Sequence, residues 1–309
     1  MKKVLVIAAV TALAAAAWAS PPQYKVVATF DSNFWWPHDA AIAPNENVYI
    51  GDHGFHLIQY FTPTGSFLGS WGGLGSGPGS FNFPLGVCVA PNAIVYVADT
   101  MNYRVQYFNA TGSYLGQWGS EGTGNGQFKY TAGIARGPNG NVYVVGQIND
   151  RVQYFTSTGS FLGKWGEFGT GNGQFDRPFH VAVRRNGDVY VTDIDNGRIQ
   201  YFTSTGSFLN KWDVGVPLGL DVAADGTVFV GNGVTDCVEY YTAAGSFLDS
   251  FGGSGWGLGS FNVPGGIAVT SDLRRVYVAD YFNDRIQYFD QTNPAVVPAS
   301  LGKVKALFR

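Results

Sequence analysis

The sequence predicts an all-β protein, a six-bladed β-propeller built from four-stranded antiparallel blades. The stretch GTGNGQF occurs at 122–128 and returns at 169–175, 47 positions later, so the chain repeats itself. Each repeat holds four short runs rich in Val, Tyr and Phe, which are typical of strands. After residue 20 no segment sustains a helical period. Four antiparallel strands in about 40 to 50 residues indicate one propeller blade per repeat.

The glycine-rich stretch itself is predicted to be a loop between strands. A phosphate-binding loop would lead into a helix and usually bring a lysine to the terminal phosphates. Instead KYTAGIARGPNGNVYVV follows the first copy, and this reads as short strands broken by an Asn-Gly turn. We therefore interpret GTGNGQF as a connection between two blades.

The number of blades follows from one anchor position, the second residue after each VYI, VYV or VFV run. It is occupied at six places along the chain, by Asp52, Asp99, Gly146, Asp193, Asn232 and Asp280. In the third unit the four predicted strands are GIARG (133–137), NVYVV (141–145), RVQYF (151–155) and SFLGKWG (160–166). Six such units predict six blades. The fourth unit is irregular, because it passes to the fifth without a glycine-rich loop.

The two ends of the repeat region predict how the ring closes. The sixth unit stops after RIQYF (285–289), so its outer strand is missing. An unassigned strand, YKVVATF (24–30), precedes the first unit. We expect residues 24–30 to complete the last blade, which would leave no long open sheet edge.

The repeats resemble the NHL-repeat family of β-propellers. The resemblance rests on the openings at Pro84–Val89 and Pro264–Val269, on the VYV-x-D strands, and on the Asn-x-Arg-[Ile/Val]-Gln-Tyr-Phe strands that begin at Asn102, Asn149, Asn196 and Asn283. It covers about residues 24–289 and implies a six-bladed propeller. It does not imply a particular function, because propellers carry many unrelated sites.

The ends of the chain differ from the blades. Residues 1–19 combine two lysines, an apolar run and Ala17-Trp18-Ala19, which predicts a secretory signal peptide. A membrane anchor is the alternative, but the run is short and rich in alanine. The propeller is assigned to 20–290, and 291–309 to a proline-containing linker with a short basic and apolar tail. The protein is thus expected to be secreted, periplasmic or on the cell surface.

The amino-acid composition limits the classes of partner that this chain is expected to bind. A net charge of −3 with no Lys/Arg run in the repeats argues against nucleic acid. Cys88 and Cys237 fall on opposite sides of the predicted ring, too far apart for a disulfide. We expect a monomer that does not span a membrane.

Recurring residues are expected to serve the blades. The recurring acids Asp52, Asp99, Asp193 and Asp280, and the recurring arginines Arg104, Arg151, Arg198 and Arg285, are predicted to cap turns and pair neighbouring blades.

Residues that break the repeat are candidates for a site. Aromatic and histidine residues gather in the first unit, where we predict a ligand-binding surface of Trp35, Trp36, His38, Asp39 and Phe55. His180, in the fourth unit, is expected on the same face across the pore. Hydrophobic packing is the alternative role for the aromatic residues.

The same region carries an alternative, a metal site of His38, Asp52, His53 and His180, with zinc or calcium as the ion. Pro37-His38-Asp39 resembles the Pro-His motifs with which the peptidyl-hydroxyglycine amidating lyase, an enzyme of the NHL-like propellers, holds zinc. His180 is one residue out of register with that motif. Surface or loop histidines without a metal are the other interpretation.

Two functions therefore stand as hypotheses. The first is a secreted, non-enzymatic binding or scaffold propeller without a cofactor, whose partner is a protein, a peptide or an envelope component, with a glycan as a further option. The second is a metal-dependent lyase or hydrolase at the pore mouth.

Overall fold

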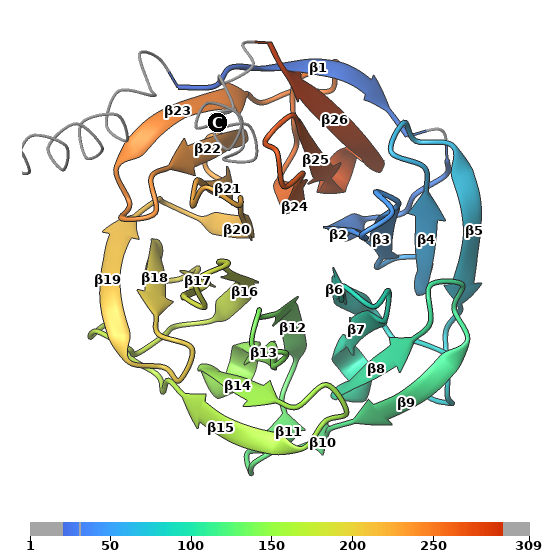
Figure 1. The fold of residues 1–309 in the computed structure, drawn as a ribbon, viewed down its shortest axis with the longest axis vertical. Coiled ribbons are helices and arrows are strands. Elements are labelled where there is room, and N and C mark those ends of the chain that lie inside the picture. Colours follow the sequence, from blue (N-terminus) through green and yellow to red (C-terminus); the bar gives the residue numbers. More distant parts are fainter. Residues whose placement is uncertain (1–20, 31, 293–309) are drawn as a thin grey trace, which may run out of the picture.

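Six four-stranded antiparallel sheets surround a central channel in the computed structural model (Figure 1), which describes residues 21–30 and 32–292. The predicted all-β, six-bladed propeller is confirmed. The predicted signal peptide and most of the tail lie outside the described residues. Among the residues that are described, no helix is long and apolar enough to cross a membrane.

Each blade runs from an inner strand at the channel to an outer strand at the rim. Blade one holds β2 (Pro37–Ile42), β3 (Val48–Asp52), β4 (Leu57–Phe61) and β5 (Phe67–Gly72). Blade two holds β6 (Pro84–Val89), β7 (Val95–Asp99), β8 (Arg104–Phe108) and β9 (Tyr114–Trp118). Blade three holds β12 (Thr131–Arg136), β13 (Val142–Gly146), β14 (Arg151–Phe155) and β15 (Phe161–Trp165).

The other blades follow the same order. Blade four holds β16 (Pro178–Val183), β17 (Val189–Asp193), β18 (Arg198–Phe202) and β19 (Phe208–Asp213). Blade five holds β20 (Pro217–Val222), β21 (Val228–Asn232), β22 (Cys237–Tyr241) and β23 (Phe247–Gly252). Blade six holds β24 (Pro264–Val269), β25 (Arg275–Asp280), β26 (Arg285–Gln291) and β1 (Tyr24–Thr29). The short parallel pair β10 (Ser120–Glu121) and β11 (Gln127–Phe128) lies in the loop between blades two and three.

The alternation of strands gives the ring two different faces. Inner strands begin, and second strands end, on what we name the loop face, as the pairing of Pro37 with Asp52 shows. The glycine-rich connections between blades lie on this face. Inner strands end on the opposite side, which we name the turn face, because it carries the tight turns after the first and third strands of each blade.

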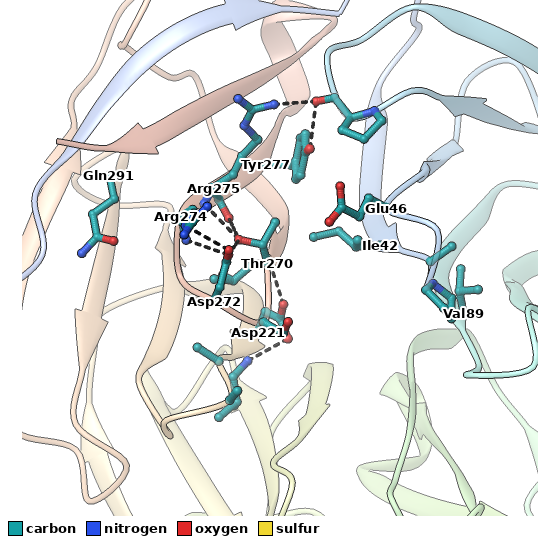
Figure 2. Close-up of a pocket in the computed structure, with 18 of the residues that line it drawn as sticks. Ile42, Glu46, Val89, Asp221, Thr270, Asp272, Arg274, Arg275, Tyr277 and Gln291 are labelled. Carbon is teal, nitrogen blue, oxygen red and sulfur yellow. Dashed lines mark hydrogen bonds and ion pairs between the residues drawn. The ribbon is translucent and has the colours of Figure 1, made fainter. Parts of the chain in front are cut away.

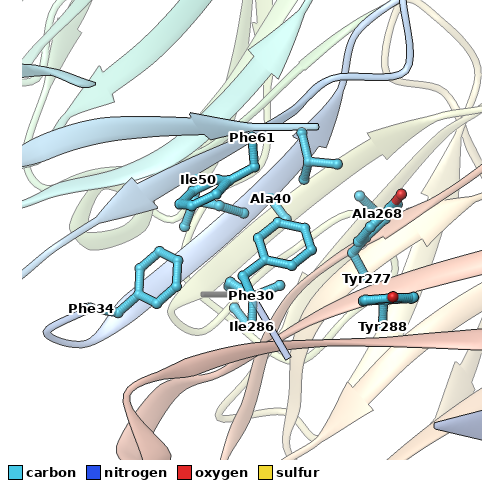
Figure 3. Close-up of a cluster of buried hydrophobic side chains, with 11 residues drawn as sticks. Phe30, Phe34, Ala40, Ile50, Phe61, Ala268, Tyr277, Ile286 and Tyr288 are labelled. Atoms are coloured by element: carbon cyan, nitrogen blue, oxygen red, sulfur yellow. The ribbon is translucent and has the colours of Figure 1, made fainter. Parts of the chain in front are cut away.

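The ring closes as the sequence predicts. Strand β1 pairs antiparallel with β26, with Tyr24 opposite Gln291 and Thr29 opposite Gln287. Phe30, the residue after β1, is buried in a cluster between blades six and one that includes Phe61 and Tyr277 (Figure 3). The first strand therefore supplies both the missing sheet edge and a packing residue at the joint.

A buried tyrosine in the second strand locks most neighbouring blades together. The Tyr49 hydroxyl donates to the Ala110 carbonyl in the next blade, 61 positions on, and the Tyr96 hydroxyl does the same to Ser157. Tyr143, Tyr190 and Tyr277 make the equivalent bonds. This bond explains why the repeated VYV strand keeps a tyrosine at a position that is otherwise apolar.

The recurring acids and arginines have the predicted structural role. Asp99 accepts a bond from the Arg104 Nε at 2.7 Å and from the main-chain N–H of Asn82, which caps the start of the blade. Arg104 also donates to the carbonyls of Gly77 and Ser80, in the loop from the preceding blade. The same pairing joins Asp193 to Arg198 and Asp280 to Arg285.

The GTGNGQF loop is held in the same way, which confirms its interpretation as a connection between blades. Arg151 donates to the carbonyls of Thr123, Gly124 and Gln127. Blade four passes to blade five without such a loop, also as expected, with only residues 214–216 between β19 and β20. Cys88 and Cys237 are free thiols.

Candidate functional site

Glycines bring the six inner strands close together around the channel. The third residue of the inner strand is glycine in four blades, namely Gly86, Gly133, Gly219 and Gly266. A Cβ at Gly133 would lie 2.7 Å from the Cα of His180, and one at Gly266 would lie 2.4 Å from the Cα of Asp39. Only blades one and four therefore bring a side chain to this level, Asp39 and His180.

Those two side chains meet across the channel. The His180 Nε2 lies 3.0 Å from the Asp39 Oδ1, and both residues are buried. Asp39 also accepts the main-chain N–H groups of Ala40 and Val87. The sequence placed His180 on the loop face, and that was wrong, because the side chain lies inside the channel and bonds to Asp39.

The environment of His180 favours its charged form. Burial by itself would lower its pKa, but attraction and hydrogen bonding from Asp39, with a further contribution from Asp221, raise the pKa above the usual value. His180 Nδ1 is buried and has no hydrogen-bond partner among the described residues. The pair thus closes the channel between the two faces and leaves one ring nitrogen unused.

Above this pair, on the loop face, two more histidines line the channel mouth. The rings of His38 and His53 are 6.0 Å apart, and His38 also packs edge-on against Phe179 and Tyr281. Burial lowers the pKa of His38 well below its usual range, and it lowers the pKa of His53 to about 4. Both imidazoles are therefore neutral at neutral pH, and the Nδ1 of each has no partner in the described chain.

The aromatic residues predicted for the ligand surface do come together. Phe55 contacts Trp35, Trp35 contacts Trp36, and Trp36 stacks on Tyr281 of blade six with 6.0 Å between ring centroids. Tyr281 in turn contacts Phe282. These five residues form an unbroken row from blade one to blade six, which we name the aromatic row. Trp35, Phe55 and Phe282 are 46%, 43% and 47% exposed.

The start of the aromatic row is fixed by main-chain contacts. Trp36 adopts a positive φ of 57°, and its N–H donates to the Asp284 carboxylate of blade six. Trp35 donates its N–H to Asp52. Asp39, the fifth residue of the predicted surface, lies below it and is engaged with His180.

The four predicted metal ligands do not gather around one point. Asp52 is fully buried and accepts hydrogen bonds from Trp35, Phe55 and Gln59. Burial raises its pKa to about 6, and no arginine offsets this, because Leu57 stands where three other blades pair an arginine with the acid. His180 is engaged with Asp39. Within residues 21–30 and 32–292, no three His, Cys, Asp or Glu side chains form a group that could hold a metal ion.

The loop face is apolar well beyond blade one, which the sequence analysis missed. The connection between second and third strands exposes a large apolar side chain in five blades, namely Phe55, Met101, Ile148, Val234 and Phe282. The loops between blades add Leu74, Phe168, Trp256 and Leu258. The signal was present in the sequence, because most of the first set lie two residues after the anchor position.

The turn face carries a cavity that was also missed. It has a volume of about 900 Å³ and is lined by residues of several blades, among them Ile42, Glu46, Asp221 and Arg275 (Figure 2). A narrower cavity of about 190 Å³ continues into the channel and is lined by His180, Cys88, Arg136 and Asp221. None of the five predicted ligand-binding residues lines either cavity.

Comparisons with known proteins agree with the fold. The family model described as NHL repeat matches residues 81–108, which contain β6, β7 and β8. A streptogramin B lyase structure is similar with a TM-score of 0.61 and 14% identity, over 89% of this chain and 99% of that chain. A comparison with curated proteins gave no match.

Virginiamycin B lyase from Staphylococcus aureus is similar with a TM-score of 0.61 and 13% identity, over 87% of this chain and 99% of that chain. A catalytically inactive form of that enzyme with quinupristin has a TM-score of 0.59 and 14% identity, over 90% of this chain and 89% of that chain. At such low identity the likeness shows the propeller fold alone.

Proposed function

We propose that this chain, which is an NHL-repeat propeller, is a binding module that recognises a protein or peptide partner through the aromatic row on its loop face. The observation that carries the proposal is the unbroken contact from Phe55 to Phe282 with three of its rings close to half exposed. Rigid, partly exposed aromatic side chains bury much area at little entropic cost, and they are enriched where proteins bind partners.

Exposed side chains near the aromatic row indicate a binding surface larger than the row itself. Exposed apolar residues continue around the loop face, and patches of this kind mark interaction sites on otherwise soluble proteins. The Trp36–Asp284 bond holds the row in place before any partner arrives. A partner would therefore meet a preformed surface, which reduces the ordering cost of binding.

The test uses peptides selected from a random display library against the immobilised protein. Trp35→Ala with Phe55→Ala should weaken binding of the selected peptides about tenfold or more, because both exposed rings are lost. Leu162→Ala is the matched control, since Leu162 is similarly exposed but lies on the outer strand β15. Equal binding by both variants would place recognition elsewhere, and selection of glycans instead of peptides would change the partner class.

A second candidate is a metal-dependent lyase or hydrolase at the channel mouth. It is favoured by the neutral imidazoles of His38 and His53, whose Nδ1 atoms have no described partner. Neutral imidazole is the form that binds zinc. Elemental analysis of protein purified without a metal-affinity tag tests it: about one zinc per chain, lost in His38→Ala, would support this candidate, and metal-free folded protein would reject it.

Export remains part of the proposal, on the pattern of residues 1–19. Expression in a bacterial host, followed by N-terminal sequencing of the exported product, should give a chain that begins at Ser20. A product retained in the cytoplasm with its first residues intact would contradict export.

A further inference from the structure

The channel opens on the turn face as a funnel. The wide cavity of about 900 Å³ and the narrow cavity of about 190 Å³ share Ile42, Val89, Asp221 and Val269 as lining residues, so they adjoin each other. His180 lines only the narrow part, which we name the shaft. Because His180 reaches across to Asp39, the shaft ends at this pair and does not reach the loop face.

Asp221 is a carboxylate without a cationic partner. It accepts the main-chain N–H groups of Val222 and Val269 at 2.7 and 2.8 Å, and no ion pair of the described residues includes it. Burial raises its pKa to about 6. Each carboxylate oxygen has two lone pairs, so both can accept a further bond from a ligand.

By contrast, two of the arginines at the mouth of the funnel are paired with carboxylates. Arg275 makes two bonds to the Asp290 carboxylate, and Arg274 pairs with Asp272. Figure 2 shows Arg274, Arg275 and Asp272 on the blade-six side of the cavity. Glu46 and Ile42 of blade one also line it. Glu46 at the mouth and Asp221 are then carboxylates that a cationic group entering the funnel can reach, and of these two Asp221 also lines the shaft.

Unused donors line the same shaft. His180 is 94% buried, since its exposed fraction is 6%, and its Nδ1 makes no hydrogen bond of normal geometry in the described chain, although the nearby Leu220 backbone helps to raise its pKa. Its raised pKa favours the form with a proton on each ring nitrogen, so Nδ1 is a donor while Nε2 serves Asp39. The Arg136 Nε is a second buried donor without a described partner. A buried donor left unpaired is unfavourable, and a ligand acceptor would satisfy it.

We propose that the shaft binds a small zwitterion, an α-amino acid with a short apolar side chain, with its carboxylate toward His180 and its ammonium group on Asp221. The two polar ends of such a ligand match a buried ring nitrogen and a carboxylate with lone pairs to spare in one narrow cavity. The half-buried aliphatic side chains of Ile42, Val89 and Val183 also line the shaft and suit an apolar side chain. The site is independent of the aromatic row, which lies on the other face.

The amino acid could be free or could end a peptide, and these sources differ in chemistry. A residue at a peptide terminus keeps only one of its two charged groups next to its side chain. L-Valine therefore represents the free ligand, while valyl-glycine and glycyl-valine represent an N-terminal and a C-terminal residue.

Calorimetric titration at about pH 7 tests the proposal with probes of matched shape. L-Valine should bind saturably. Isovalerate lacks the ammonium group and isobutylamine lacks the carboxylate, so each should bind about tenfold more weakly or worse. Valine binding no tighter than either half-probe would overturn the proposal, and so would the absence of valine binding. A dipeptide that binds more tightly than valine would overturn the free amino acid as the source.

Variants locate the site. Asp221→Asn should remove the preference for valine over isovalerate, whereas Glu46→Gln removes a charge at the mouth only and should leave that preference unchanged. Because Asp221 supports two main-chain N–H groups, its variant could unfold, so Ala135→Leu provides a second test by filling the shaft without touching a polar group. Valine binding unchanged in folded Ala135→Leu would place the ligand outside the shaft.

Discussion

His180 of blade four donates from Nε2 to the Asp39 carboxylate of blade one, 3.0 Å away and 141 positions earlier in the chain. The bond spans the channel and connects inner strands on opposite sides of the ring. Its effect on stability depends on pH. Burial alone would lower the pKa of His180, but Asp39 raises it, so this stabilisation is complete below the unfolded pKa of about 6.5 and is lost as pH rises through the folded pKa.

Asp39→Asn is expected to lower the free energy of unfolding by roughly 3 kcal/mol at acidic pH, because His180 then loses the carboxylate that offsets the cost of burying its charged form. Since the His180 imidazolium loses its proton at higher pH, the difference from wild type should shrink as pH rises. Urea denaturation at several pH values between about 6 and 9 measures it.

The control for this prediction is Asp195→Asn, which breaks an exposed pair with Arg177. Exposed pairs contribute about 0–1 kcal/mol, so this variant should differ little from wild type at any pH. A pH-independent loss in Asp39→Asn would show that His180 is neutral in the folded protein.

Blade three lacks the acid that pairs with arginine elsewhere, and Gly146→Asp should restore it. The Arg151 Nε has no described partner, and the Asn149 side chain takes over the cap by accepting the Lys129 N–H. Gly146 has a φ of −97° and a ψ of 96°, close to the −89° and 83° of Asp99. The new carboxylate should raise the free energy of unfolding by about 1–2 kcal/mol, measured by urea denaturation.

Gly146→Ala adds the Cβ without the carboxylate, so it separates the effects of the two groups on stability. That Cβ would lie 2.8 Å from the Asn149 Oδ1, so the alanine variant should be neutral or less stable than wild type. Equal stability of the alanine and aspartate variants would argue against pairing with Arg151.

Tyr96→Phe should lower the free energy of unfolding by about 1 kcal/mol, because it removes the bond to the Ser157 carbonyl in the next blade and leaves that acceptor unpaired. Tyr107→Phe is the control, since the Tyr107 ring packs on Tyr96 without an equivalent bond among the described residues. Thermal unfolding of both variants measures the difference. Equal losses in the two variants would show that the bond to the Ser157 carbonyl does not account for the effect.

His56 makes the joint between blades one and two sensitive to acid. Its Nδ1 accepts the Phe83 N–H at 2.9 Å, so the bond requires an unprotonated nitrogen. Burial lowers the pKa of His56, although Asp99 opposes the shift. This stabilisation is therefore present above the unfolded pKa of about 6.5 and is lost as pH falls through the folded pKa.

His56→Asp should reduce that sensitivity, because Asp150 and Asp236 accept the corresponding N–H groups in other blades. The free energy of unfolding of the variant should equal that of wild type at pH 7. Between pH 7 and pH 5 it should fall by about 1 kcal/mol less than that of wild type. Denaturation at the two pH values measures it. An unchanged acid response would assign the loss to His38 and His53, whose pKa values are lowered further.

Local patterns in the sequence were enough to predict the architecture. The period-two runs, the turn residues and the recurring Asp and Arg side chains all act within one blade or between neighbours. The pairing of residues 24–30 with the last blade could also be predicted, because the sixth unit lacked its outer strand and residues 24–30 belonged to no unit. The gathering of Trp35, Trp36 and Phe55 followed from their closeness along the chain.

Only the tertiary structure shows which residues from opposite sides of the ring come into contact. The sequence determines that His180 and Asp39 break the repeat. It does not show that the other four blades have glycine at this level of the channel, so that these two side chains meet there. Asp221 became notable only once the ring placed it beside a cavity with no ion pair of its own among the described residues. Such relations depend on the closure and radius of all six blades together, which is a property that no single repeat encodes.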